Sequence, residues 1–361
     1  MSTNSQPSFE NLLSQKQWTS YHEFIKEAPK LYANEIAMHV QAEAELIAKL
    51  KKHELFKKLA IREVKPRLDE AAELLNSGKV VAVDGTRCSY RTYSGMRCQI
   101  GVVAVNYSGE QIKRSFFISE AGFRKPIDDV IQAVAKRNTS EDQISEMVVR
   151  ALMLYREREA GMDKQFKDRF VMFHGPLLPF ELMTGLGRWR ALEKTLNVLE
   201  RLISEKRFFS IISTTAFQDY LTFGRAIERG QYLTASDYTV GHHIADNRDF
   251  MARDKWRDDE FDRMQRFLRN YAEQIMIGVI RVSDRPYVFH AHRDTFDLAA
   301  AIIARDAMHQ REKGFPLLID YADTLCSKYF SSGDFNNMME FELARRGEYL
   351  SEVPEQRLRL K

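Results

Sequence analysis

The spacing of apolar residues separates an N-terminal helical stretch from the sheet that follows it. From about Ile36 to Ser77, apolar side chains recur mostly at helical steps among Lys and Glu, which predicts amphipathic helix interrupted or kinked at Pro66. Such a stripe packs equally well on the protein's own core or on a dimer or partner surface. We therefore expect a helical arm over residues 1–77 and leave its docking partner open.

A strand pattern replaces the helical one after this arm. Val80 to Val83 form an apolar run closed by Asp84-Gly85, which favours a short strand buried on both faces. Residues 99–106 and 111–118 flank the turn sequence at 107–110 and predict two more strands. The three segments predict a meander.

Helices and strands alternate through the rest of the chain. Helical periodicity recurs over residues 140–160, around residues 189–203 and over 296–310, whereas apolar runs at 170–173, 274–282 and 287–290 predict strands. The last two strands are joined by a turn at 283–286, which predicts a hairpin. We expect an α/β fold: a mixed sheet flanked by helices over residues 78–330, with helical insertions and a helical tail at 331–361.

Composition narrows the class of protein. Hydrophobic residues make up 44% and charged residues 29% of the 361, which is typical of a globular protein. No stretch reaches the roughly 20 apolar residues of a membrane span, and residues 1–9 lack a signal-peptide pattern, so we expect a cytoplasmic protein without membrane contact. The net charge of +3 is too small to indicate or exclude nucleic-acid binding.

Cysteine and histidine give no zinc framework. Cys88, Cys98 and Cys326 cannot all pair and form no CxxC knuckle, although the first two could be neighbours across a hairpin as thiols. The histidines at 242, 243, 290 and 292 invite a zinc hypothesis, but two histidines at i and i+2 share one face of a strand without any metal. We therefore expect no zinc site.

Two predicted strands end in a possible metal ligand followed by glycine. These are Asp84-Gly85 and His174-Gly175. Rigid strand backbone would hold the side chain, and glycine would let a phosphate or a metal approach the main chain. Because Asp-Gly is also a common turn, one instance alone carries little weight.

Two further acids are candidates. Glu157 continues the apolar stripe of Val149 and Met153 at four-residue steps, so it is favoured over Glu159 for the inward position, with a solvated glutamate paired to arginine as the alternative. Asp323 follows the apolar run 315–319 and could complete a cation site, or serve as an acid near a helix N-terminus.

Four short motifs follow one another along the chain. They are Val81-Ala82-Val83-Asp84-Gly85-Thr86, Phe173-His174-Gly175-Pro176-Leu177, Ile277-Gly278-Val279-Ile280-Arg281, and Gly314-Phe315-Pro316-Leu317 with Ala322-Asp323. In these motifs and in their order the chain resembles the NurA family of nucleases. The motifs span about two-thirds of the chain, from Lys79 to Asp323. The resemblance implies an RNase H-like fold, a manganese-dependent nuclease acting on DNA ends and single strands, a homodimer, and a hexameric HerA-type ATPase as partner.

The chain departs from the archaeal pattern of this family at two ligand positions. It has His174 where the family has Asp, and Asp323 where the family has His. This reciprocal exchange would keep a mixed carboxylate and imidazole set, and imidazole suits Mn²⁺ better than Mg²⁺. The resemblance thus implies that Asp84, Glu157, His174 and Asp323 are catalytic and hold one or two Mn²⁺ ions, with Mg²⁺ as the alternative.

Basic residues near the first motif are candidates for binding DNA. Arg87, Arg91 and Arg97 are interleaved with aromatic residues and could follow a phosphate backbone while bases stack, or they could belong to a solvated hairpin. Arg281 could contact phosphate or a carboxylate, or could be a partly buried structural arginine.

Two other functions compete with the nuclease hypothesis. One is a catalytically silent DNA-binding or scaffold subunit, which is suggested by His174 in the second motif. The other is an RNase H-like enzyme that acts on RNA. Salt-sensitive DNA binding without cleavage would favour the first. The polarity of digestion, the pathway (DNA repair or defence against foreign DNA) and the need for the ATPase are not encoded in these patterns.

Overall fold

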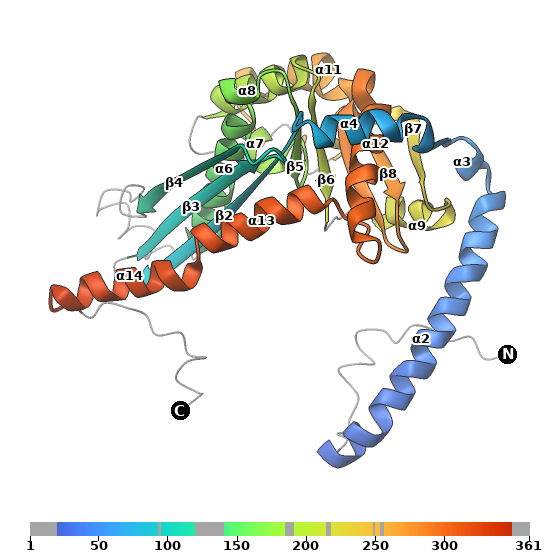
Figure 1. Ribbon diagram of the computed structural model, residues 1–361, viewed down its shortest axis with the longest axis horizontal. Helices are drawn as coiled ribbons and strands as arrows, with labels where there is room; N and C mark the ends of the chain where they lie inside the picture. Colours follow the sequence, from blue (N-terminus) through green and yellow to red (C-terminus); the bar gives the residue numbers. More distant parts are fainter. Residues whose placement is uncertain are drawn as a thin grey trace. The chain divides into compact units, whose positions relative to one another are not determined.

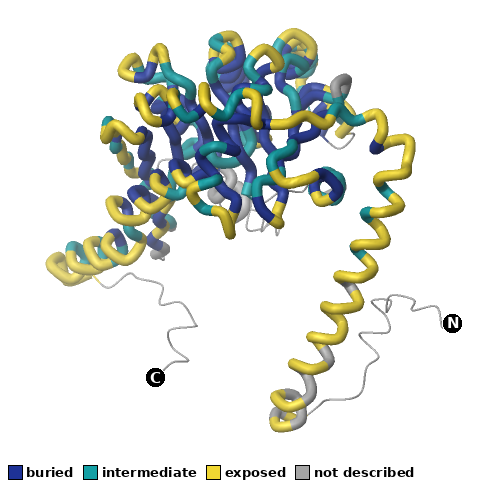
Figure 2. The backbone as a smooth tube through the Cα atoms, turned by 45° about the vertical axis from the view of Figure 1, so that its right-hand side comes forward, coloured by how far each residue is buried: buried dark blue, intermediate teal, exposed yellow. Residues whose placement is uncertain are grey.

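The computed structural model describes residues 20–92, 95–119, 141–184, 191–213, 218–247, 250–252 and 256–348. The chain divides into two compact units, Met1–His53 and Glu54–Lys361. In the smaller unit the described element is helix α2 (Tyr21–Lys52), which starts 15 residues before the predicted helical stretch and contains Pro29. Most of the described part of α2 is exposed (Figure 2). The exposed residues include apolar ones such as Ile36, Met38 and Val40.

The larger unit starts earlier than the predicted end of the helical arm. After α3 (Glu54–Lys57), the chain forms strand β1 (Ala60–Glu63), which pairs with β7, and helix α4 (Leu68–Asn76), which packs on α12. Residues 54–77 therefore belong to the sheet-containing unit, and so does α14 (Ser332–Arg345) from the predicted tail. The assignment of nuclease function to residues 78–330 stays a prediction.

In the described residues, nine strands form one mixed sheet in the order β1-β7-β8-β9-β6-β5-β2-β3-β4 (Figure 1). Besides β1, the strands are β2 (Val80–Thr92), β3 (Gly95–Val105), β4 (Gln111–Ser119), β5 (Phe170–His174), β6 (Phe208–Ile212), β7 (Gln231–Thr239), β8 (Ile275–Arg281) and β9 (Pro286–His292). The three central strands β2, β5 and β6 are parallel, and the other pairings are antiparallel. The predicted α/β class, meander and hairpin are confirmed.

Strand β2 is much longer than the short strand predicted at Val80–Val83. Its pairing with β5 ends at Val83, but its antiparallel pairing with β3 continues to Thr92. Asp84 and Gly85 therefore lie inside a strand and form no turn. The apolar run marks only the part of β2 that is covered on both faces by protein.

Helices cover both faces of the sheet. On one face α4, α12 (Phe296–Ala307) and α13 (Leu317–Tyr329) enclose a core with alternate residues of the strands, such as Ala82 and Met172. On the other face α6 (Glu141–Gly161) packs against β2 and β3, and α9 (Gln218–Ala226) packs against β8 and β9. The remaining helices are α7 (Phe180–Met183), α8 (Leu192–Ser204), α10 (Val240–Ala245) and α11 (Asp258–Asn270), with short 3₁₀ turns between elements.

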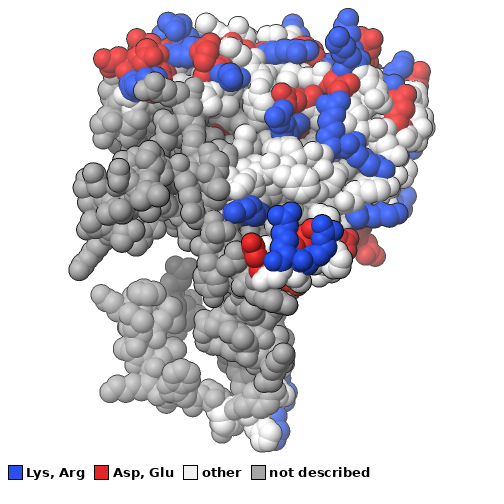
Figure 3. Space-filling view, turned by 90° about the vertical axis from the view of Figure 1, so that its left-hand side faces the viewer, with Lys and Arg blue, Asp and Glu red and all other residues white. Residues whose placement is uncertain are grey.

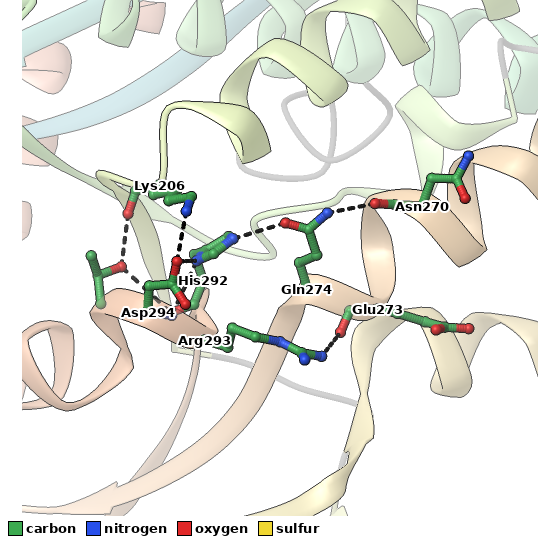
Figure 4. Close-up of polar contacts among 8 residues, drawn as sticks. Lys206, Asn270, Glu273, Gln274, His292, Arg293 and Asp294 are labelled. Carbon is green, nitrogen blue, oxygen red and sulfur yellow. Dashed lines mark hydrogen bonds and ion pairs between the residues drawn. The ribbon is translucent and has the colours of Figure 1, made fainter.

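Three of the four histidines considered for zinc are held by hydrogen bonds or by burial in the fold. His292 ends β9, accepts a hydrogen bond from the backbone N–H of Asp294 at 3.1 Å and contacts the Gln274 side chain at 3.0 Å, as Figure 4 shows. His242 takes part in the capping box of α10 with Thr239. His290 is buried inside β9, where burial lowers its pKa to about 3.

The three cysteines are free and buried. Cys88 pairs with Gln99 and Cys98 with Ser89 across the β2–β3 hairpin, so the two thiols are offset by one position. No described helix combines the length and apolar character that crossing a membrane requires.

Candidate metal site on the central strands

Asp84 and His174 lie next to each other on adjacent parallel strands. The β2–β5 register pairs Val83 with Phe173, so the following residues of the two strands are Asp84 and His174. Side chains alternate along a strand, and both residues therefore project to the face covered by α13. Nδ1 of His174 is 3.4 Å from Oδ1 of Asp84.

Glu157 comes from α6, which covers the opposite face of the sheet. Its carboxyl approaches β2 at Gly85, the residue that follows Asp84. A Cβ atom at Gly85 would lie only 2.5 Å from Oε1 of Glu157 and 2.9 Å from Cγ of Met153, so the absence of a side chain at Gly85 makes room for this carboxyl. Glu157 is 2% exposed. Glu159 is partly exposed and pairs with Arg156 at 2.5 Å. The structure therefore brings Glu157, and not Glu159, to the central strands.

Asp323 comes from α13. This helix starts at Leu317, so Asp323 lies in its second turn and is not an acid at its N-terminus. The buried carboxylate of Asp306 on α12 accepts the backbone N–H of Leu318 at 2.9 Å and thereby fixes the start of α13. One turn after Asp323, Sγ of Cys326 donates to the backbone oxygen of Asp84 at 3.2 Å, which fastens the helix directly over β2.

The four side chains act on one another electrostatically. Burial raises the pKa of Glu157 to about 7, with a further contribution from the charge of Asp84, against the lowering effect of Arg158. Burial also raises the pKa of Asp323, together with the charge of Asp84 and a hydrogen bond to it. Burial alone would lower the pKa of His174, but Asp84, Glu157 and Asp323 together raise it. The candidate residues, far apart in sequence, thus form one cluster.

The donor chemistry of this cluster fits a divalent cation. It offers three carboxyl groups and one imidazole, and the charge of Asp84 raises the pKa of both Glu157 and Asp323, as expected of neighbouring carboxylates. In the part of the chain that the structure describes, no three His, Cys, Asp or Glu side chains already stand as a ligand set. The close contact between His174 and Asp84 takes up donor atoms that a cation would use, so binding requires side-chain rotation.

Two residues that the sequence patterns did not indicate support the cluster. Nε2 of His174 is 2.8 Å from Oγ of Ser213, which follows β6, and the ring of His174 meets Phe315 edge-on. Arg158 is fully buried, and its Nη1 is 2.6 Å from Oε2 of Glu157. In the sequence Tyr155-Arg156-Glu157-Arg158-Glu159, an arginine is expected to be a solvated ion-pair partner. The burial of Arg158 is therefore evident only from the packing of α6.

The predicted DNA-binding arginines do not gather on one surface. Arg87 and Arg97 belong to opposite faces of the β2–β3 hairpin, because Arg87 pairs with Ile100 whereas Arg97 pairs with Tyr90. The side chain of Arg91 lies outside the described residues. Arg281 is separated from β2 by three strands, and its Nη1 donates to the carbonyl oxygens of Arg225 and Ile227, each at 2.7 Å. Figure 3 shows one face of the molecule, on which basic and acidic side chains are interspersed.

Comparisons with known proteins give a likeness of fold. No family model and no curated protein sequence matches the chain. Among solved structures, the chain is similar to the NurA nuclease from Sulfolobus solfataricus, with 10% identity, a TM-score of 0.43, and coverage of 79% of this chain and 95% of that one. A NurA structure with manganese aligns with 12% identity, a TM-score of 0.46 and coverage of 78% and 96%.

A NurA structure bound to dAMP and manganese is also similar to the chain. It aligns with 11% identity and a TM-score of 0.39 over 84% of this chain and 93% of that one. At these identities and scores, the likeness concerns the fold alone.

Proposed function

We propose that the chain is a divalent-metal-dependent nuclease that hydrolyses phosphodiester bonds of DNA at ends and in single strands. The observation that carries this proposal is the convergence of Asp84, Glu157, His174 and Asp323 from β2, α6, β5 and α13. Their residue types suit a cation that must also bind phosphate, because hard oxygen ligands dominate and one imidazole completes the set.

In this proposal each residue has a defined task. Asp84 is the central ligand because it lies against both His174 and Asp323. If Nε2 of His174 donates its proton to Ser213, the neutral ring keeps a lone pair on Nδ1, the atom nearest to Asp84. Glu157 supplies a carboxylate from the buried side, where bulk water is excluded.

One or two bound cations would supply the charge that activates a water molecule and stabilises the leaving oxygen. The chain's own contribution is to hold the ligands on rigid elements. Asp84 and His174 are fixed by the β2–β5 register, and Asp323 is fixed by α13, which is anchored at Leu318 and Cys326. Asp323 is exposed to solvent, which leaves an approach for a phosphate.

We propose Mn²⁺ as the preferred ion, because the imidazole of His174 makes the set less suited to Mg²⁺, which prefers oxygen ligands. On the strength of the ordered motifs, we also propose a hexameric HerA-type ATPase as partner, a homodimer, and a cytoplasmic role in DNA end processing or defence. The exposed apolar side chains of α2 support a protein partner.

The test is cleavage of linear and single-stranded DNA by the purified chain with Mn²⁺, with Mg²⁺ and with EDTA, alone and with the ATPase. We expect Mn²⁺-dependent cleavage that Asp84→Asn and Glu157→Gln abolish. Glu159→Gln is the matched control, since this acid lies on the same helix but faces solvent. Equal cleavage by the wild type and Asp84→Asn would remove the proposed site.

A catalytically silent DNA-binding or scaffold subunit is the second candidate. It is favoured by the contact between His174 and Asp84 and by the absence of a ready ligand set among the described residues. Salt-sensitive DNA binding without cleavage under any metal would select it. Matched RNA substrates in the same assay separate a ribonuclease from both.

A further inference from the structure

Arg158 makes a set of contacts that a structural ion pair does not require. Its side chain is 0% exposed, its Nη1 is 2.6 Å from Oε2 of Glu157 and 3.3 Å from the carbonyl oxygen of Leu154, and its Nη2 donates to the carbonyl oxygen of Pro176 at 2.6 Å. The guanidinium lies 4.8 Å from the ring centre of Phe173. One buried side chain thus joins α6 to the segment that carries His174.

Burial of this arginine is costly. Taking a charged pair out of water carries a desolvation penalty that close contact offsets only in part. In addition, the buried Nε of Arg158 has no hydrogen-bond partner in the described part of the chain. A buried donor without a partner costs stability, so its retention calls for a specific role.

Because of the contact with Arg158, the two carboxyl oxygens of Glu157 have different surroundings. Oε2 is held by Arg158, whereas Oε1 lies beside Gly85, where an added Cβ would be 2.5 Å away. Gly85 directly follows Asp84 on β2. The carboxylate therefore cannot turn freely, and Oε1 is the oxygen that lies against β2, at the residue after Asp84.

We infer that Arg158 is a positioning residue, which holds Oε2 of Glu157 so that Oε1 alone serves as the cation ligand and which couples this ligand to the His174 segment through Pro176. The inference rests on the proposed cation site. An outer residue that orients a metal ligand typically changes metal affinity 10- to 100-fold when it is removed.

The experiment measures Mn²⁺ affinity of the full chain by titration calorimetry, without DNA. We expect Arg158→Met to weaken Mn²⁺ binding by about tenfold or more. Arg158→Lys keeps a charge for Glu157 but cannot also reach Pro176, and we expect an intermediate loss. Arg156→Met is the matched control, because Arg156 lies on the same helix and pairs with the partly exposed Glu159. The Mn²⁺ affinity of this variant should equal that of the wild type.

A double-mutant cycle separates positioning from general damage. In a Glu157→Gln background the oxygen that Arg158 directs is already replaced, so adding Arg158→Met should change Mn²⁺ affinity less than about twofold, in line with coupling between contacting residues. The double variant buries no unpaired charge, so it also serves if Arg158→Met alone does not fold. Equal losses in both backgrounds, or wild-type affinity in Arg158→Met, would overturn the inference.

The two proposals fail in different ways. A wild-type chain that binds Mn²⁺ but cleaves no DNA would refute the nuclease function, while the cycle would still decide the role of Arg158. A wild-type chain that binds no Mn²⁺ would overturn the inference about Arg158 and the preference for Mn²⁺, while cleavage with Mg²⁺ would still decide the nuclease function. Where cleavage is present, Arg158→Met should lower kcat at saturating DNA with little change in KM, because Arg158 is buried and does not contact DNA.

Discussion

Gly85→Ala tests whether the close approach of α6 to β2 builds the site. The new Cβ would lie 2.5 Å from Oε1 and 3.1 Å from Cγ of Glu157, and 2.9 Å from Cγ of Met153. Carbon contacts are comfortable at about 3.5 to 4.0 Å, so Glu157 would have to move by roughly 1 Å. Its carboxyl is held at Oε2 by Arg158 and cannot swing aside without breaking that contact.

The expected destabilisation follows from overpacking. Added methyl groups in a packed core cost about 1–3 kcal/mol, and we expect a value in this range from urea unfolding monitored by circular dichroism. Displacing Oε1 should also weaken Mn²⁺ binding, so the loss of cleavage should exceed what the unfolded fraction explains. The backbone is not the cause, since Gly85 does not adopt a positive φ.

Gly333→Ala in α14 is the control, because the nearest atom to its added Cβ is Oγ of Ser331 at 3.6 Å. It should leave stability unchanged or raise it by less than about 1 kcal/mol, as is typical of glycine replacement in a compatible helix. If Gly85→Ala unfolds at the same urea concentration as the wild type and binds Mn²⁺ equally, the proposed approach of Glu157 to β2 is wrong.

Three further predictions concern α13, Arg281 and pH. Asp306→Ala removes the acceptor of Tyr107 and Leu318, and should lower the free energy of unfolding by about 2–4 kcal/mol in urea titrations; a change below 0.5 kcal/mol would contradict the anchoring of α13. Arg281→Met should destabilise by about 1–3 kcal/mol yet leave the salt dependence of DNA affinity unchanged, whereas a shallower salt slope would assign it to phosphate binding. Without metal, the raised pKa values of Glu157 and His174 make the folded state bind more protons than the unfolded state. The stabilisation by His174 is full below its ordinary pKa of 6.5, and that by Glu157 is full below 4.5. Both are lost as pH rises through the raised folded values, so metal-free stability should fall as pH rises from 4.5 to about 7. Thermal melts in EDTA check this, and a melting temperature that rises across this window would contradict it.

Local sequence patterns were enough to predict those helices and strands whose conformation depends on residues close together in the chain. The strands at 170–173 and 275–281 and the helix at 296–307 were predictable because period and turn signals agree within each segment. Asp84 and His174 were predictable as a pair because each follows an apolar run, and parallel strands bring such positions together.

Features that depend on distant partners were not predictable. β1 is mostly exposed and owes its strand conformation to pairing with β7, about 170 residues later in the chain. The extension of β2 beyond Val83 comes from β3 and has no apolar signal. Arg158 and Asp306 look like ordinary charged helix residues, and only packing against Pro176 and Tyr107 distinguishes them.

The choice between Glu157 and Glu159 shows how far helical periodicity can predict the site. The four-residue step from Met153 correctly favoured Glu157 as the inward residue. The same periodicity could not show that Gly85 makes room for it, because that fit involves two elements far apart in the chain.

A crystal structure of the chain with Mn²⁺, using the anomalous signal of manganese, tests the central claim most directly. We predict a peak at about 2.0 to 2.6 Å from Asp84 and from Oε1 of Glu157, the range of hard-cation bonds to oxygen. His174 or Asp323 should complete the ligand set. A peak elsewhere in the molecule, or none at saturating Mn²⁺, would contradict the account.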